Sequence, residues 1–246
     1  MTAPRAVATN LRCEYLKDPL AIDAGQPRLS WEMDSDAPGA AQSAYRLIAA
    51  DSKAALKSNH GNLWDSGKVE SSQSMHVHYA GTPLASCQQV FWKVKLWDEQ
   101  GRAGRWTKAA TFTMGLLDQS EWQGEWIGNY LGNTHTSPLL RKEFALRGKV
   151  TRALFHATAC GIYHLTLNGK AVHDDLFAPG WTDFKKRRYY RCYDLTRQLQ
   201  RGEQHCLGAE LGDGWYREWY GGWGNDKKRY GTNVTLLGQL RIEYED

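Results

Sequence analysis

The sequence has no long hydrophobic run. Among its 246 residues the longest uninterrupted apolar stretch has four, at 47–50, whereas a membrane-spanning helix needs about 20. The first ten residues also lack the apolar segment of a secretory signal. The first absence excludes a membrane-spanning helix, and the second leads us to expect a cytoplasmic protein.

Paired cysteines, strong charge and the common catalytic motifs are missing too. The five cysteines are odd in number and form no C-x-x-C pair, so neither a zinc site nor a disulfide framework is indicated. The net charge is only +4 and is spread along the chain, which is too weak to predict a nucleic-acid partner. No nucleophile elbow, phosphate-cradling loop or zinc-protease motif is present.

Aromatic residues and glycines are abundant instead, with 11 tryptophans, 12 tyrosines and 24 glycines. Aromatic side chains favour strands and glycines favour turns. Apolar and polar residues alternate in segments such as 91–97 (FWKVKLW) and 163–167 (YHLTL), the second ending in the hairpin signal Asn168-Gly169. Only residues 52–58 look helical. The pattern predicts an all-β protein with short strands, as in β-sandwiches.

The alternation breaks at residues 115–120 (GLLDQS). We therefore expect two β-sandwich domains, at residues 1–117 and 118–246. The final expected strand, at 236–244, runs up to the last residues of the sequence without a closing turn.

Several motifs resemble a known family. Residues 27–31 (PRLSW), 63–69 (LWDSGKV) and 92–98 (WKVKLWD) are similar to the fibronectin-III-like domain that opens bacterial α-L-rhamnosidases. Residues 122–128 (WQGEWIG), 139–144 (LLRKEF), 178–184 (APGWTDF), 193–196 (YDLT) and 211–217 (LGDGWYR) resemble the jelly-roll domain that follows it. The resemblance covers nearly the whole chain, in order.

The resemblance implies an accessory, substrate-facing region of an enzyme that hydrolyses terminal α-L-rhamnosides. The family's acidic catalytic residues lie in a helical barrel, and no such helical segment is seen here, so we assign no catalytic residue and expect the chain to be inactive alone. The expected partners are rhamnose-containing glycosides and the missing catalytic domain. The jelly-roll is expected to be incomplete at its C-terminus, with an unpaired edge near residues 236–244 that favours self-association.

Two loops are candidates for carbohydrate binding. They contribute Trp181 and Asp183, and Asp213, Trp215, Tyr216 and Arg217. An aromatic ring can cover the apolar face of a sugar while a charged group holds its hydroxyls. The alternative is that these tryptophans only pack against the sandwich or the catalytic barrel. Asp213 stands where the family usually has Asn, which weakens the transfer of a sugar site.

Carboxylates in and around these loops could also serve as a catalytic pair or as calcium ligands. Asp174, Asp175, Asp183, Glu210 and Asp213 could supply a glycosidase pair, but aspartates are also common turn residues. Asp174, Asp175, Asp213 and Asp226 are oxygen donors of the type that calcium prefers, although no calcium-loop spacing is present. No metal or other cofactor is therefore assigned, and calcium stays the one candidate.

The basic run 185–188 (KKRR) beside Tyr189 and Tyr190 is expected to be a solvated strand edge rather than a nucleic-acid patch. Three function classes stay open at this point. They are a sugar-recognising or barrel-bracing region of a rhamnosidase, the full glycosidase of which this is a piece, and a structural interaction module without sugar binding. Whether Trp181 and Trp215 line one open cleft would separate a binder from a brace.

Overall fold

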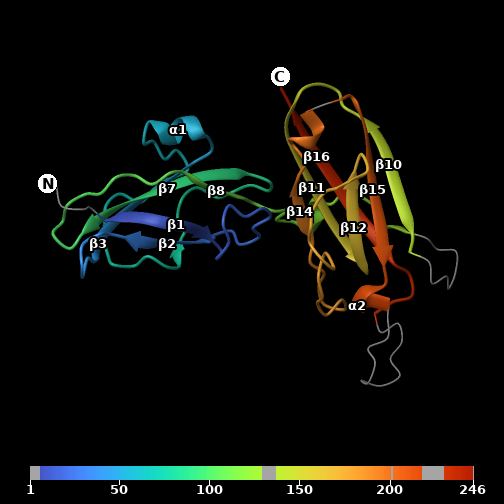
Figure 1. The fold of residues 1–246 in the computed structure, drawn as a ribbon, viewed down its shortest axis with the longest axis horizontal. Coiled ribbons are helices and arrows are strands. Elements are labelled where there is room, and N and C mark those ends of the chain that lie inside the picture. The colour runs from blue at the N-terminus through green and yellow to red at the C-terminus, as the bar shows by residue number, and fades with distance from the viewer. Residues whose placement is uncertain (1–5, 129–136, 201, 218–229, 246) are drawn as a thin grey trace, which may run out of the picture. The chain divides into compact units, whose positions relative to one another are not determined.

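A computed structural model describes residues 6–128, 137–200, 202–217 and 230–245. The chain divides into two compact units, residues 1–121 and 122–246, coloured from blue to green and from green to red in Figure 1. The division falls directly after the segment 115–120 in which the sequence alternation breaks. No helix in the described part of the chain is long and apolar enough to cross a membrane.

The N-terminal unit (residues 1–121) is built from two antiparallel sheets. One has the strand order β1-β2-β6 and the other β4-β3-β7-β8, with β5 also paired to β3. The elements are β1 (Val7–Cys13), β2 (Arg28–Asp34), β3 (Gln42–Ala50), α1 (Lys53–Lys57), β4 (Trp64–Asp65), β5 (Val69–Glu70), β6 (Val77–His78), β7 (Gln89–Asp98), β8 (Ala110–Thr113) and the 3-10 turn η1 (Gln119–Glu121).

The alternating residues of β7 form the centre of this unit. Trp92, Val94 and Leu96 are fully buried, as their shared face predicts. Lys93, expected on the opposite, polar face, is buried as well, because α1 covers it and its Nζ donates to the Leu56 carbonyl at 2.5 Å. Burial lowers the pKa of this lysine.

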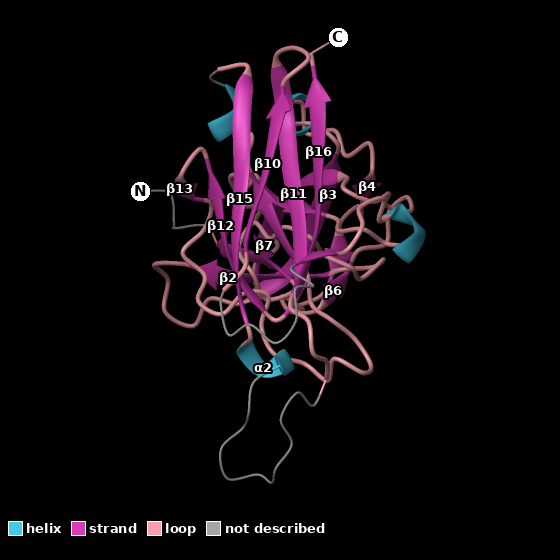
Figure 2. Cartoon of the chain, turned by 90° about the vertical axis from the view of Figure 1, so that its right-hand side faces the viewer, coloured by secondary structure: helices cyan, strands magenta, loops and turns pink. Residues whose placement is uncertain are grey.

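The C-terminal unit (residues 122–246) is a second sandwich. Its sheets have the orders β10-β15-β12-β13 and β14-β11-β16-β9, and the long strands run side by side in Figure 2. The elements are β9 (Ile127–Gly128), β10 (Leu139–Ala145), β11 (Val150–Cys160), β12 (Ile162–Leu167), β13 (Lys170–Ala171), β14 (Arg191–Asp194), η2 (Gln198–Gln200), β15 (Gln204–Gly212), α2 (Gly214–Arg217) and β16 (Thr235–Tyr244).

Inward-facing apolar residues from both sheets form the core of the C-terminal unit. Ala153, Ala157, Leu165 and Leu211 are each at most 1% exposed, and they belong to one cluster of packed side chains. The predicted hairpin joins β12 to β13 through Asn168 and Gly169, both at positive φ, as a type I′ turn requires. The prediction of an all-β fold with two sandwich domains is confirmed.

The last strand, β16, was expected to leave an unpaired edge near residues 236–244. One side of β16 pairs with β11 along its length, and the other side pairs with β9 only at Thr235 and Leu236. Among the described strands, the expected unpaired edge is therefore present on that second side beyond Leu236.

Candidate functional site

Three aromatic side chains, two of them exposed, gather where α2 meets the long loop after β13. We call Phe177, Trp181 and Trp215 the aromatic patch. The rings of Trp181 and Trp215 stack at 6.3 Å between centroids with 15° between their planes, and Phe177 meets Trp215 edge-on at 5.7 Å. Phe177 is 60% and Trp181 57% exposed, and the neighbouring Leu176 is 84% exposed. A contiguous exposed apolar group of this kind marks a contact surface.

Close packing against β12 holds the α2 side of the patch. A Cβ atom at Gly214 would lie 2.6 Å from the Cγ2 atom of Ile162, and Gly214 has φ of +49°. Only glycine allows this close approach without displacing the isoleucine. The packing therefore fixes where α2 begins and where Trp215 projects.

The charged residues beside the patch are paired with each other. Arg217 Nη2 lies 2.5 Å from Asp213 Oδ1, and the two side chains are 11% and 24% exposed. The loops therefore bring Asp213 and Arg217 together next to Trp215, but the pairing uses much of their capacity to hold a sugar hydroxyl.

The remaining predicted site residues have structural roles. The Oδ1 atom of Asp183 accepts from the Lys185 amide at 3.1 Å, so the carboxylate stabilises its own turn. Tyr216 is half-buried against Phe184, whose ring it meets edge-on at 5.4 Å, and burial raises the pKa of its hydroxyl.

The sequence analysis missed Phe177. Its signal was the pair Leu176–Phe177, two adjacent large apolar residues in a loop that otherwise contains aspartates, proline and glycine. An apolar pair with no alternating neighbours has no face to bury in a sheet, so this pair could have been assigned to a contact surface.

The calcium candidates are not brought together. The described residues contain no group of three or more histidine, cysteine, aspartate or glutamate side chains that could hold a metal ion. Asp174 and Asp175 are exposed, and Asp213 is engaged by Arg217. Asp226 lies outside the described residues.

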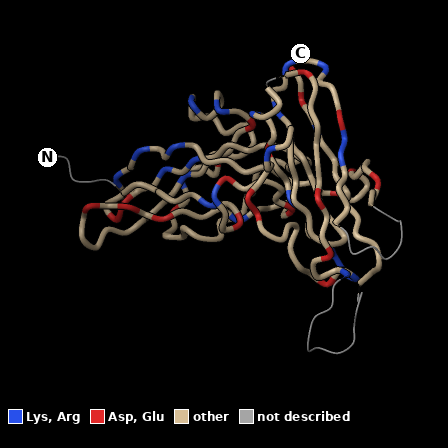
Figure 3. The backbone as a smooth tube through the Cα atoms, turned by 45° about the vertical axis from the view of Figure 1, so that its right-hand side comes forward, with Lys and Arg blue, Asp and Glu red and all other residues tan. Residues whose placement is uncertain are grey.

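The basic run at residues 185–188 is not a strand edge, as was expected, but part of an exposed turn and loop. The turn forms because the Asp183 carbonyl accepts from the amides of Lys186 and Arg187. Lysine, arginine and acidic residues are interspersed along the chain in Figure 3.

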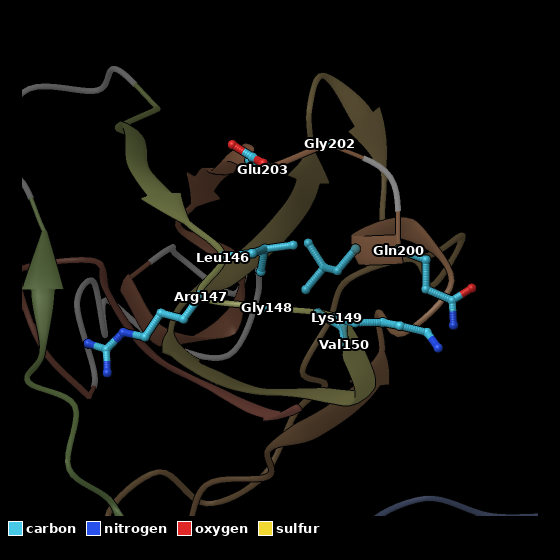
Figure 4. Close-up of a pocket in the computed structure, with 9 residues that line it drawn as sticks. Leu146, Arg147, Gly148, Lys149, Val150, Gln200, Gly202 and Glu203 are labelled. Atoms are coloured by element: carbon cyan, nitrogen blue, oxygen red, sulfur yellow. The ribbon is translucent and has the colours of Figure 1, made fainter. Parts of the chain in front are cut away.

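A hollow of about 600 Å³ lies under the connection between β10 and β11. The side chains of Arg147, Lys149 and Glu203 at its rim extend in different directions in Figure 4. Ligand sites require polar groups that converge on one point, so we assign no site here.

A histidine with a buried side chain lies at the start of the loop that carries the patch. The His173 ring stacks on Tyr193 at 4.6 Å between centroids, and its side chain is only 6% exposed. Both ring nitrogens are buried without a hydrogen-bond partner in the described structure. The nearest opposite charge is the Asp175 carboxylate, 3.8 Å from Nδ1. Burial lowers the pKa of His173, and this outweighs the opposing effect of Asp175.

The lowered pKa of His173 predicts that the unfolding free energy falls in mild acid. In the unfolded chain this histidine takes up a proton near pH 6.5, while the folded protein resists protonation until a lower pH. The stabilisation is therefore complete above pH 6.5 and is lost progressively as the pH falls below it. Urea unfolding should give a lower free energy at pH 5.5 than at pH 7.5.

The matched control for this prediction is His173→Phe, which keeps a ring on Tyr193 but cannot titrate. This variant should show a smaller difference between the two pH values. An equal difference in wild type and variant would assign the pH dependence to other groups.

Comparison with known proteins agrees with the two-unit division. Residues 8–118 match the family model described as the Rha78A-like, N-terminal immunoglobulin domain. Residues 148–246 match the α-L-rhamnosidase N-terminal domain. An α-L-rhamnosidase of Formosa agariphila is 35% identical over 243 residues, which cover 95% of this chain and 26% of that protein.

Solved structures show the same fold. An α-L-rhamnosidase from Dictyoglumus thermophilum superposes with a TM-score of 0.85 at 30% identity, over 97% of this chain and 27% of that one. The Streptomyces avermitilis α-L-rhamnosidase complexed with L-rhamnose gives 0.87 at 25% identity, over 97% and 39%. The chain thus spans about a quarter to two-fifths of the length of these relatives. Its two units match the domains that open such enzymes, and the chain is an N-terminal region of the α-L-rhamnosidase family, as its motifs predicted.

Proposed function

We propose that this chain is the accessory region of an enzyme that hydrolyses terminal α-L-rhamnosides, and that its aromatic patch braces the catalytic part of that enzyme. The observation that carries the proposal is the stacking of the exposed Trp181 on the half-buried Trp215, with the exposed Phe177 beside them. Large aromatic residues of this kind are the anchors of protein interfaces.

The chemistry around the patch favours a protein partner over a sugar. A sugar site needs free hydrogen-bonding groups near its aromatic platform, but Asp213 and Arg217 pair with each other and Asp183 stabilises its own turn. The aliphatic Leu176 next to the patch is 84% exposed. It adds apolar area that a hydroxyl-rich ligand does not need.

The bracing role predicts a loss of stability that depends on the catalytic part. We consider a chimera in which residues 1–246 replace the matching region of the Formosa agariphila enzyme. Trp181→Ala should lower its thermal unfolding midpoint, because truncating an interface anchor costs about 2 kcal/mol or more. In the isolated chain the ring is exposed, so the same substitution should change the unfolding free energy by at most about 0.5 kcal/mol.

The matched control is Tyr189→Ala, which removes an aromatic ring that is 45% exposed outside the patch. It should leave the midpoint of the chimera unchanged. Equal midpoints for Trp181→Ala and the unsubstituted chimera would contradict the bracing role.

Carbohydrate recognition is the second candidate, supported by the exposed ring of Trp181 beside the Asp213–Arg217 pair. An indole face can cover the methyl group and C–H bonds of rhamnose. Calorimetric titration of L-rhamnose into wild type, Trp181→Ala and Asp213→Ala, with and without calcium, separates the two functions. Binding by wild type that is lost in both variants would replace bracing with recognition, and folded wild type is expected not to bind.

A further inference from the structure

The outer face of the larger sheet in the N-terminal unit is basic and aromatic. Leu47 of β3 and Val94 of β7 belong to the core of this unit. Because side chains alternate along a strand, Arg46, Lys95 and Trp97 lie on the opposite, outer face. The helix α1 packs over one end of this face and is seen above β7 in Figure 1. At the other end Arg46, Lys95 and Trp97 stay half-buried, so that part of the face is accessible.

Two half-buried tryptophans on this face are each approached by two cations. The distances from cation to ring centroid lie between 5.2 and 5.8 Å, with Lys68 and Lys95 at Trp97, and Arg46 and Lys93 at Trp106. Trp106 also packs against the apolar cluster under α1. Arg46 and Lys95 are direct cross-strand partners, which makes the two groups continuous. We call these six residues the cation–aromatic array.

The cation–aromatic array carries more positive than negative charge. Two of its cations have carboxylate partners, in the pairs Arg46–Asp65 and Lys68–Glu70. Lys93 donates instead to the Leu56 carbonyl. Lys95 forms no ion pair with any residue that the structure describes. Four cations and two carboxylates therefore leave a net charge of +2 on the array.

The position of Lys95 is electrostatically costly without a partner. Lys95 and Arg46 oppose each other directly on β7 and β3, and like charges at such positions destabilise a sheet. The Asp65 carboxylate offsets the charge of Arg46 with two hydrogen bonds, but no described carboxylate does so for Lys95. An anion bound at Lys95 would remove the repulsion, so the array fits an anionic partner.

The two indole rings favour a sugar polymer among anionic partners. An indole can cover the C–H face of a pyranose ring, while a cation beside it holds a carboxylate or sulfate group. The β7 part of the array, residues 93–97, extends over about 14 Å at roughly 3.4 Å per residue. That length suits a chain of sugar rings better than a single small ion. Nucleic acid carries one phosphate per nucleotide and is bound by larger clusters of cations.

We propose that the cation–aromatic array binds an anionic polysaccharide. Sugar rings stack on Trp97 and Trp106, and carboxylate or sulfate groups on the polymer are held by Lys95 and the neighbouring cations. The choice of a polysaccharide rests on the proposed function, because the enzyme acts on glycosides. The positive charge of the array does not rest on it, and the aromatic patch belongs to the other unit.

Binding of the isolated chain to immobilised polymers, followed by biolayer interferometry, tests the proposal. The probes are polygalacturonate, dextran sulfate, neutral dextran, inorganic polyphosphate and single-stranded DNA. We expect binding to polygalacturonate or dextran sulfate, and the tighter of the two identifies carboxylate or sulfate as the preferred anion. Neutral dextran should not bind, and polyphosphate should bind more weakly because it has charge but no sugar ring. Binding should weaken as salt is raised, since contacts between exposed charges are screened.

Three results of this experiment would overturn the proposal. The first is that the folded chain binds neither anionic polysaccharide. The second is that polyphosphate binds as tightly as both of them, which would mean that the face recognises charge alone. The third is tighter binding of single-stranded DNA, which would assign the face to nucleic acid.

A pair of lysine substitutions locates the charge contact. Lys68→Gln with Lys95→Gln should weaken polysaccharide binding about fivefold or more, because each exposed charge contact contributes up to about 1 kcal/mol. The matched control is Lys185→Gln with Lys186→Gln, which removes the same charge from the basic run of the C-terminal unit. It should change the affinity less than about twofold. Equal losses in the two double variants would show non-specific attraction and would contradict the proposal.

A tryptophan substitution tests the ring contact separately from charge. Trp97→Leu keeps an apolar side chain but removes the flat ring, so it should weaken polysaccharide binding and leave polyphosphate binding unchanged. Trp181→Leu, in the aromatic patch, is the matched control and should leave both unchanged. Near-ultraviolet circular dichroism confirms that each variant is folded. Loss of binding in Trp181→Leu but not in Trp97→Leu would place the sugar at the aromatic patch and overturn the proposal. Bracing is not tested by any of these measurements, so the two proposals can fail separately.

Discussion

No turnover of an aryl α-L-rhamnoside above the buffer rate is the expected result for the isolated chain. Glycoside hydrolysis needs two carboxyl groups that face each other across the scissile bond. No two of the candidate carboxyl groups in this chain are shown to face each other, because each has another partner or lies exposed on the surface. Asp213 is paired with Arg217, Asp183 stabilises a turn, and Asp174 and Asp175 are exposed on the loop after β13. Glu210 is exposed on β15.

The large rate acceleration of glycosidases makes this assay decisive. Enzymes accelerate their reactions by about 10⁶-fold or more, so even slight activity would be visible against the buffer. The assay follows release of the aryl group at high protein concentration, with the Formosa agariphila enzyme as the positive control. Turnover that copurifies with the chain and disappears in Asp213→Asn or Glu210→Gln would show that the chain itself is catalytic.

Most of the fold could be predicted from the sequence, because strands have a period of two that a single sequence displays. The alternation in β7 and β12 and the turn at Asn168-Gly169 identified strands and a hairpin that the structure contains. The residue types within each of these segments were sufficient to predict its secondary structure. The family motifs then supplied the identity of the two units, which periodicity alone does not give.

The failures arose where tertiary contacts override local pattern. Lys93 alternates like an exposed residue, yet α1, more than 30 positions earlier in the sequence, covers it. The partner of β16 could not be predicted from the sequence either, because β11 lies about 80 residues earlier in the chain.

The candidate site was predicted only in part for the same reason. Motifs identified Trp181 and Trp215, but only the fold reveals that their rings stack and that Phe177 lies against Trp215. It also reveals that Asp213 and Arg217 neutralise each other.

Gly161→Ala should destabilise the C-terminal unit severely. Gly161 connects β11 to β12 with φ of +134°, a region that residues with a side chain rarely adopt. An added Cβ would lie 2.4 Å from the carbonyl oxygen of Gly212 and 3.1 Å from the Cγ1 atom of Val234. The oxygen belongs to the backbone of β15, so it cannot rotate away. We expect backbone strain and steric overlap together to cost about 3 kcal/mol or more.

The matched control is Gly169→Ala in the β12–β13 hairpin. Gly169 also has positive φ, +77°, but nothing lies within 4 Å of the added Cβ, so only the strain of about 1–2 kcal/mol applies. Both unfolding free energies are measured by urea titration of the isolated chain, with near-ultraviolet circular dichroism as the signal that reports unfolding. A C-terminal unit already unfolded in Gly161→Ala would agree with the prediction, whereas a loss no larger than that of Gly169→Ala would contradict it. The consequence extends to function, because the carbonyl that Gly161 approaches immediately precedes Asp213 and α2, which carry the charged pair and Trp215. The absence of a side chain at the connection between β11 and β12, which lie in different sheets, therefore allows the close approach to the end of β15 that leads into α2.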